Sequence, residues 1–316
     1  MSDAKPYTEA WLPGPDGHQF YTRTYRPRAS PHAAVVFIHG FAEHVARHEH
    51  AHSNWATKHM LVFTFDQRGF GRTALDPERR SKDASYGKTS HQQQMRDIEW
   101  WVRHVKRDYP DLPLFLFGHS MGGALVLAFP TQTEPPPSKY TLEMLSGVIA
   151  SSPLIIQTTP RSRLLRKVAG AAALVVPWMQ FPAKVPPEAS PDLSHDPAVS
   201  NAVGSDPLIK EYGTLRGLVD MLDRGERVLR FGHQYWPKKL PILIVHGTYD
   251  KVTSHKASEK FFGKINAENK KLLLYPGAYH EITNEPDGVK EKFWYDCDGW
   301  ITDVLYKLYF NSRNPG

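Results

Sequence analysis

The chain has 316 residues, of which 41% are hydrophobic and 23% are charged, as in ordinary globular proteins. Its formal charge is +6, but we find no basic stripe or recognition motif that would indicate binding of nucleic acid. The single cysteine, Cys297, excludes an intramolecular disulfide and favours a reducing compartment. Because no stretch approaches the roughly 18 apolar residues of a membrane-spanning helix, and the first residues contain no apolar core of the signal-peptide type, we expect a cytoplasmic protein. Any contact with membranes or lipid droplets would be peripheral.

The first part of the chain predicts a mostly parallel sheet flanked by helices. Residues 9–25 alternate polar and apolar around a Gly/Pro-rich turn, which is typical of an antiparallel hairpin at a sheet edge. Apolar runs at 33–39 and 61–65 predict buried strands with a helix over 43–59 between them. Ser90 begins the capping box of the next helix. This order of strand, helix and strand indicates parallel pairing with right-handed crossovers.

Residues 112–129 then read as a buried strand, a sharp turn and a buried helix. The turn carries the pattern Gly-x-Ser-x-Gly around Ser120, between Gly118 and Gly122. Glycines allow so tight a reversal, and the serine at its apex projects above the strand ends. Ser120 is therefore the candidate nucleophile. A sixth strand is predicted at 146–150.

The alternation of strands and helices stops between Pro153 and Trp236. We predict a core formed by residues 1–152 and 237–316, and a helical and irregular cap over 153–236, inserted after the sixth strand. Within the cap, helical periodicity appears only at Arg161–Trp178 and Leu215–Phe231.

The start of this cap combines a basic cluster with an apolar and aromatic run. Such a pattern is typical of an interfacial segment that lies on a membrane, of a lid helix that packs its apolar face on the core, or of both at once. We treat Leu174, Trp178 and Phe181 as candidate cap contacts with a substrate. The basic residues are Arg161, Arg163, Arg166 and Lys167.

A serine nucleophile requires a base, and that base requires a group that orients it. The parallel pattern resumes with strands at 241–247 and 271–275. Asp250 and His280 follow the ends of these strands, on the sheet edge where Ser120 also emerges, and in the chain order of nucleophile-elbow hydrolases. We predict Ser120, Asp250 and His280 as a catalytic triad.

The oxyanion of an acyl-transfer reaction requires N–H donors, which the nucleophile-elbow folds supply from the main chain. Phe41 and Met121 occupy those positions. His44 and His48 are spaced i, i+4, but no glutamate stands between them as in a His-Glu-x-x-His zinc motif. We therefore expect no metal and no cofactor.

Four segments of the chain resemble the monoacylglycerol lipase family of α/β-hydrolases, and its fungal members most. They are His39-Gly40-Phe41-Ala42-Glu43-His44, Gly118-His119-Ser120-Met121-Gly122-Gly123, Ser205-Asp206-Pro207-Leu208 and Gly277-Ala278-Tyr279-His280. The resemblance implies an α/β-hydrolase fold with a cap, the same triad and the same oxyanion donors. One departure is Ala42, where many members carry glycine.

The family implies hydrolysis of a monoacylglycerol, or a similar lipid ester, to glycerol and a free fatty acid. A triad fixes acyl transfer but not the leaving group. A lysophospholipase or broader carboxylesterase is therefore the alternative among enzymes. A catalytically silent lipid-binding homologue is the alternative outside them.

Overall fold

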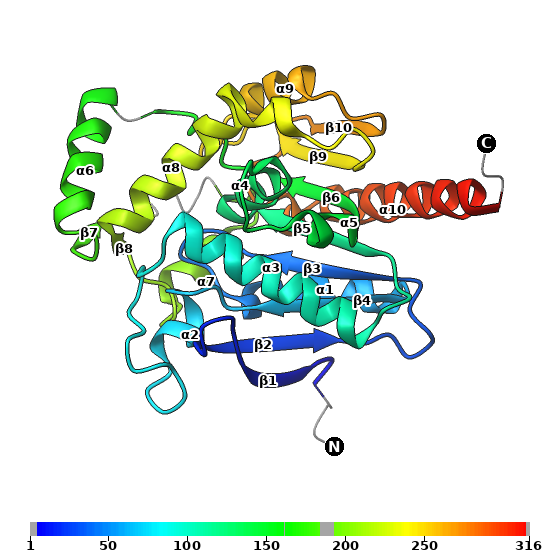
Figure 1. Cartoon of the computed structure of the whole chain (residues 1–316), viewed down its shortest axis with the longest axis horizontal. Coiled ribbons are helices and arrows are strands. Elements are labelled where there is room, and N and C mark those ends of the chain that lie inside the picture. The colour runs from blue at the N-terminus through cyan, green and yellow to red at the C-terminus, as the bar shows by residue number, and fades with distance from the viewer. Residues whose placement is uncertain (1–4, 161, 184–192, 314–316) are drawn as a thin grey trace.

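The computed structural model describes residues 5–160, 162–183 and 193–313, and it centres on one eight-stranded sheet (Figure 1). The spatial order of its strands is β1-β2-β4-β3-β5-β6-β9-β10. The strand β2 is antiparallel to β1 and β4, and every other neighbouring pair is parallel. The mostly parallel sheet predicted from the sequence is thereby confirmed. The strands are β1 (Thr8–Pro13), β2 (Gln19–Tyr25), β3 (Ala33–Ile38), β4 (Met60–Phe65), β5 (Leu114–His119), β6 (Leu145–Ser151), β9 (Ile242–Gly247) and β10 (Lys270–Tyr275).

Helices cover both faces of this sheet. On one face lie α3 (His91–Asp108), α4 (Met121–Ala128) and α9 (His255–Lys264), and on the other α1 (Glu49–Thr57) and α10 (Val289–Arg313). Successive residues of a strand point to opposite faces, so the wholly apolar strand β3 contributes to both cores. Each large aliphatic side chain buried in this way stabilises the fold by about 1.5–3 kcal/mol.

The helix expected over 43–59 begins later than the sequence indicates. The segment η1 (Val45–His48) is a 3-10 turn that leads into α1, and His44 is extended. The reason is local: the Glu43 carboxylate accepts a hydrogen bond from the Gly40 main chain, which keeps this stretch in a loop. Other short elements are α2 (Gly71–Leu75), η2 (Phe129–Thr131), α5 (Lys139–Glu143), η4 (Gly232–Tyr235) and η5 (Ile282–Asn284).

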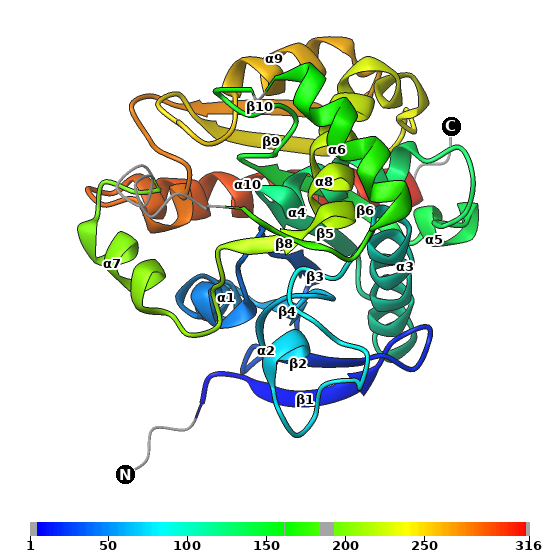
Figure 2. The ribbon, with the colours of Figure 1, turned by 90° about the vertical axis from the view of Figure 1, so that its left-hand side faces the viewer.

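The described elements between Pro153 and Trp236 lie beyond the carboxyl ends of the parallel strands (Figures 1 and 2). The sequence indicated two helices there, but the structure has a third, α7, which begins at a proline. Proline is tolerated in a first turn, and the Asp196 carboxylate caps this helix by accepting from the Ala198 N–H. The elements are α6 (Arg163–Val175), β7 (Gln180–Pro182), α7 (Pro197–Ser205), β8 (Tyr212–Thr214) and α8 (Leu215–Arg230).

The last helix, α10, has 25 residues and projects beyond the sheet (Figure 1). Phe293, Cys297, Trp300 and Val304 of its apolar stripe are buried, whereas Leu308 is 45% exposed on the projecting part. Among the described helices, none has the length and apolar character needed to cross a bilayer.

Candidate active site

Ser120 lies in the turn between β5 and α4, in a backbone conformation that side chains rarely adopt, with φ 55° and ψ −116°. The flanking glycines explain how the chain reaches it. A Cβ at Gly118 would lie 2.1 Å from the Gly122 carbonyl oxygen, and a Cβ at Gly122 would lie 2.1 Å from that of Ile38. Strain of this kind persists only where the surroundings enforce it, and it is concentrated at functional sites. The turn thus presents Ser120 at the sheet edge as the pattern predicts.

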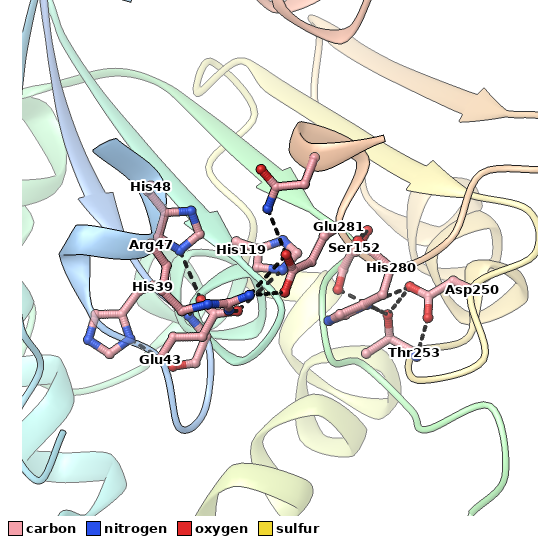
Figure 3. Close-up of polar contacts among 12 residues, drawn as sticks. His39, Glu43, Arg47, His48, His119, Ser152, Asp250, Thr253, His280 and Glu281 are labelled. Carbon is pink, nitrogen blue, oxygen red and sulfur yellow. Dashed lines mark hydrogen bonds and ion pairs between the residues drawn. The ribbon is translucent and has the colours of Figure 1, made fainter. Parts of the chain in front are cut away.

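Asp250 and His280 meet at the same edge of the sheet (Figure 3). The His280 Nδ1 lies 2.7 Å from the Asp250 Oδ2, which leaves the other ring nitrogen, Nε2, on the side away from Asp250. The Asp250 carboxylate is held by the main-chain N–H groups of Val252 and Thr253, both at 2.8 Å, and by the Thr253 hydroxyl at 2.7 Å. The carboxylate is therefore fixed before any substrate arrives.

This pairing shifts the pKa values of both groups. Burial opposes ionisation of Asp250, but the attraction of His280 and the hydrogen bonds outweigh it, so its pKa lies well below the usual range. Burial alone would lower the pKa of His280, but the negative charge of Asp250 raises it above the ordinary value. The pair therefore stabilises a protonated His280, which is what a base needs after it accepts a proton.

Ser120 and His280 line one cavity of about 560 Å³. Among the interactions of the described residues there is no hydrogen bond between the two side chains, so the structure brings them to a shared cavity and not into contact. Such hydrogen bonds are often long in proteins without substrate. The edge of the His280 ring that is not held by Asp250 is the part available to Ser120.

The cavity is apolar over most of its wall. This apolar wall comes from α6, the β7 strand and α8, together with the Phe41 ring. Of the three cap residues singled out in the sequence, Phe181 lies on the wall, whereas Leu174 and Trp178 are 76% and 43% exposed and are not among the lining residues. Wall residues include Ala169, Ala172, Met179, Phe181, Leu218 and Leu222.

Of the two predicted oxyanion donors, Met121 directly follows Ser120 in the chain and Phe41 lines the same cavity as Ser120. Met121 begins α4, and Phe41 follows the end of β3. In the part of the chain that the structure describes, the main-chain N–H groups of Phe41 and Met121 donate to no protein acceptor. Ala42, the departure noted in the sequence, is buried with φ 55°, a left-handed conformation that glycine adopts without strain. The loop therefore keeps the glycine-type backbone despite the alanine.

A group of charged residues that the sequence did not predict lies beside the candidate triad. The Arg47 guanidinium lies between two carboxylates, 3.1 Å from Glu43 and 2.8 Å from Glu281 (Figure 3). All three residues line the cavity, and we call them its charged end. His48 contacts Glu43 at 3.0 Å. The available sequence signals were the i, i+4 spacing of Glu43 and Arg47 and the position of Glu281 directly after His280.

At the charged end, attraction between neighbouring charged groups offsets the cost of burying each charge. Burial disfavours the charged form of Glu43, but His119, His48 and Arg47 favour it more strongly, so its pKa is held well below the usual range. Burial likewise opposes ionisation of Glu281, and Arg47 lowers its pKa below the ordinary value. Since an unpaired buried charge is costly, each member depends on the others.

The two histidines considered for metal binding have other partners. His44 Nε2 lies 2.7 Å from the Asp206 carboxylate, and His48 contacts Glu43. Nowhere in residues 5–160, 162–183 and 193–313 do three or more His, Cys, Asp or Glu side chains gather as metal ligands would.

The sheet is mostly parallel and covered on both faces, a strained serine follows the strand β5, and an aspartate is paired with a histidine. Together these features define a serine hydrolase of the α/β-hydrolase class. A family model described as serine aminopeptidase, S33, matches residues 29–287. The chain belongs to the monoacylglycerol lipase family within this group, which confirms the resemblance seen in the sequence.

Similar proteins and structures agree with this assignment. The monoglyceride lipase of Saccharomyces cerevisiae is 32% identical over 84% of this chain and 83% of its own length. The monoacylglycerol lipase of Mycolicibacterium smegmatis is 28% identical over 92% of this chain and 96% of its own. A crystal structure of a soluble variant of the Saccharomyces cerevisiae enzyme in complex with a substrate analog matches with a TM-score of 0.82 and 27% identity, covering 96% of this chain and 97% of that one.

Proposed function

We propose that this protein hydrolyses monoacylglycerols to glycerol and free fatty acid through an acyl-enzyme on Ser120. The observation that carries the proposal is the cavity shared by Ser120 and His280, which is apolar along most of its wall and is also lined by the buried cluster of Glu43, Arg47 and Glu281. A monoacylglycerol has the same division between a long apolar chain and a compact polar head. The names of the yeast and mycobacterial relatives support this substrate class.

In the proposed mechanism Ser120 Oγ attacks the ester carbonyl carbon while its proton passes to His280 Nε2. Asp250 orients His280 and stabilises its protonated form. When the tetrahedral intermediate collapses, the ester bond breaks and the glycerol oxygen takes the proton from His280. A water molecule then gives its proton to His280 and attacks the acyl carbon. Collapse of this second intermediate returns the proton to Ser120 and releases the fatty acid.

The main-chain N–H groups of Phe41 and Met121 serve as the oxyanion hole in this proposal. Their lack of a protein acceptor in the described part of the chain supports the role, because a donor already in use would be weaker toward an oxyanion. Removal of one such donor typically lowers kcat by about 10²–10³-fold.

The charged end is the proposed site of the glycerol moiety. Hydroxyl groups both donate and accept, so they suit a cluster that offers guanidinium donors and carboxylate acceptors together. Arg47 is already paired with Glu43 and Glu281, so it is a poor receptor for an added anion. This pairing favours a neutral glycerol head over the phosphate of a lysophospholipid.

Residues 153–236 act as the cap in this proposal, and the apolar wall receives the acyl chain. Phe181 is proposed as a direct contact. Leu174 and Trp178, which are exposed and do not line the cavity, are proposed to contact a membrane or lipid droplet, as peripheral binding would require.

The basic part of that membrane contact is smaller than the sequence indicated. Arg161 and the side chain of Arg163 lie outside the described residues, and Arg166 is paired with Asp223 and Glu226. Lys167 is exposed. Sedimentation with anionic vesicles tests the contact: Leu174→Ser with Trp178→Ser should reduce binding more than Lys167→Gln does, and undiminished binding of the double variant would contradict it.

A substrate panel tests the proposed function. We expect the enzyme to hydrolyse monoacylglycerols with a higher kcat/KM than lysophosphatidylcholine or short water-soluble esters. Ser120→Ala should abolish all three activities. Preference for lysophosphatidylcholine or for the short esters would favour the lysophospholipase or carboxylesterase alternative. Lipid binding without any turnover would favour a silent homologue.

A further inference from the structure

The helix α8 carries a buried charge where an apolar residue is expected. Arg224 stands among Met221, Gly225 and Val228 on the face of α8 that packs on the core, and it is only 3% exposed. Among the described residues no carboxylate forms an ion pair with it, and one of its terminal nitrogens, Nη1, has no partner. Burial lowers its pKa to about 10, so it stays charged at neutral pH. Asp220 favours the charged form of Arg224 but forms no ion pair with it, and burying a charge without a direct ion pair is costly, so its position calls for an explanation.

The Arg224 guanidinium fixes the orientation of a buried side-chain amide on α3. It donates through Nη2 to the Gln94 Oε1 and through Nε to the His91 Nδ1, the latter at 3.1 Å. Because the Gln94 oxygen is committed to Arg224, its Nε2 must face the other way. That nitrogen donates to the Gln67 Oε1 at 3.2 Å and lies 3.9 Å from the Met121 sulfur.

The next member, Gln67, is oriented in the same manner. Its Oε1 accepts from Gln94, so its Nε2 donates to the His39 carbonyl oxygen at 2.6 Å. Its main-chain N–H donates to the His39 Nε2 at 2.9 Å. All donors in this chain of hydrogen bonds therefore point from α8 toward the end of β3.

The chain of hydrogen bonds ends on the peptide unit between Gly40 and Phe41. Since the His39 Nε2 accepts from Gln67, its proton lies on Nδ1, which donates to the Gly40 carbonyl oxygen at 2.7 Å. Burial lowers the pKa of His39 to about 3, in agreement with a neutral ring. A hydrogen bond to a peptide carbonyl polarises the N–H of the same unit, which here is the N–H of Phe41.

We propose that Gln67, Gln94 and Arg224 are positioning residues for the oxyanion hole. They hold it in place and polarise it through this chain of hydrogen bonds. Gln94 is linked to both donor residues, through Gln67 and His39 toward Phe41, and directly to the side chain of Met121. Arg224 makes this arrangement depend on α8, so the seating of the cap on the core contributes to the chemistry. The inference rests on the proposed function, in which Phe41 and Met121 are the oxyanion donors.

The test compares a ligand that forms the oxyanion with one that does not. A long-chain alkyl trifluoromethyl ketone adds Ser120 to form a tetrahedral oxyanion adduct, whereas a 1-O-alkylglycerol ether occupies the cavity without reaction. The variant Gln94→Glu keeps size and the acceptor for Arg224 but cannot donate to Gln67. We expect its inhibition constant for the ketone to rise about 10–30-fold and kcat to fall by a similar factor, less than for loss of a donor itself. The constant for the ether and KM should change by less than about twofold, since ground-state binding is untouched.

A matched control is Gln132→Leu, which removes another amide that contacts His91 but lies outside the chain of hydrogen bonds. It should leave the ketone constant within about twofold of the parent value. Thermal unfolding of each variant reports whether it folds. If Gln94→Glu does not fold, Arg224→Met leaves both glutamines in place and should weaken the ketone selectively, with Arg224→Lys recovering part of the loss.

An unchanged ketone constant and kcat, or parallel weakening of ketone and ether, would overturn the inference while leaving Ser120 chemistry intact. Failure of the proposed function has a different signature, because the single variant Ser120→Ala would then remain active. In that case the inference falls with it.

Discussion

The charged end and the apolar wall of the cavity beside Ser120 differ in burial and in bonding. At the charged end, Glu43 and Glu281 are 6% and 1% exposed, and each carboxylate contacts Arg47 at a defined distance. On the apolar wall, Val168 and Phe181 are 59% and 49% exposed. Charged groups out of water are stable only in fixed geometry, whereas apolar contact is non-directional. The charged end is therefore suited to recognise one kind of head group, and the apolar wall to accept chains of different length.

The largest effect is expected at the aspartate that supports the base. Asp250→Asn should lower kcat by about 10³–10⁴-fold, because a neutral amide cannot stabilise protonated His280. Asp206→Asn is the control, since it removes a carboxylate that also lies 2.7 Å from a histidine, His44. Steady-state hydrolysis of a monoacylglycerol measures both. Comparable losses in the two variants would contradict the assignment of Asp250.

The second prediction concerns stability at the charged end. Arg47→Met would remove the guanidinium that the buried carboxylates of Glu43 and Glu281 share, so the free energy of unfolding at neutral pH should fall by about 3–5 kcal/mol. Arg166 on the apolar wall is paired with two partly exposed carboxylates, and Arg166→Met should cost less than about 1 kcal/mol. Denaturant unfolding monitored by fluorescence gives both values. Equal costs would remove the contrast between the two ends.

Much of the fold and the candidate triad could be predicted because those signals are local. A buried strand, a glycine-flanked serine and two polar residues after later strands all follow from short patterns and the geometry of parallel sheets. The charged end could not be predicted, because Arg47 meets Glu281 across 234 positions of the chain. The helix α7 was not predicted because helical periodicity in the cap appears only in two other segments, and α7 is short and begins at Pro197. The buried Arg224 had no sequence signal beyond its place on an apolar helix face.

A third prediction follows from the raised pKa of His280. As the pH falls through this pKa, the base becomes protonated, so kcat/KM should fall about tenfold per pH unit on the acid side. Asp250 keeps its charge throughout because its pKa lies well below the usual range. In Asp250→Asn the anion that raises the pKa is gone, and burial should move the acid limb of the residual activity to lower pH. If the acid limb of the pH–rate profile lay at the same pH in Asp250→Asn as in the parent enzyme, Asp250 would not be the group that raises the pKa of His280.

The smallest effect is expected on the apolar wall. Phe181→Ala should lower kcat/KM for a medium-chain monoacylglycerol by about three- to tenfold, as loss of partly exposed apolar contact implies. Activity on a short ester should be unchanged. Leu174→Ala, from the same cap but outside the cavity, should stay within about twofold for both substrates when they are monomeric. Equal losses for Leu174→Ala would place the acyl chain elsewhere.

The central claim is that Ser120 is the nucleophile that attacks a substrate bound between the charged end and the apolar wall. A fluorophosphonate probe followed by mass-spectrometric mapping of the adduct tests it most directly. We predict a single adduct on Ser120, lost together with hydrolytic activity in Ser120→Ala. An adduct on another residue, or labelling and hydrolysis that persist in Ser120→Ala, would contradict the account.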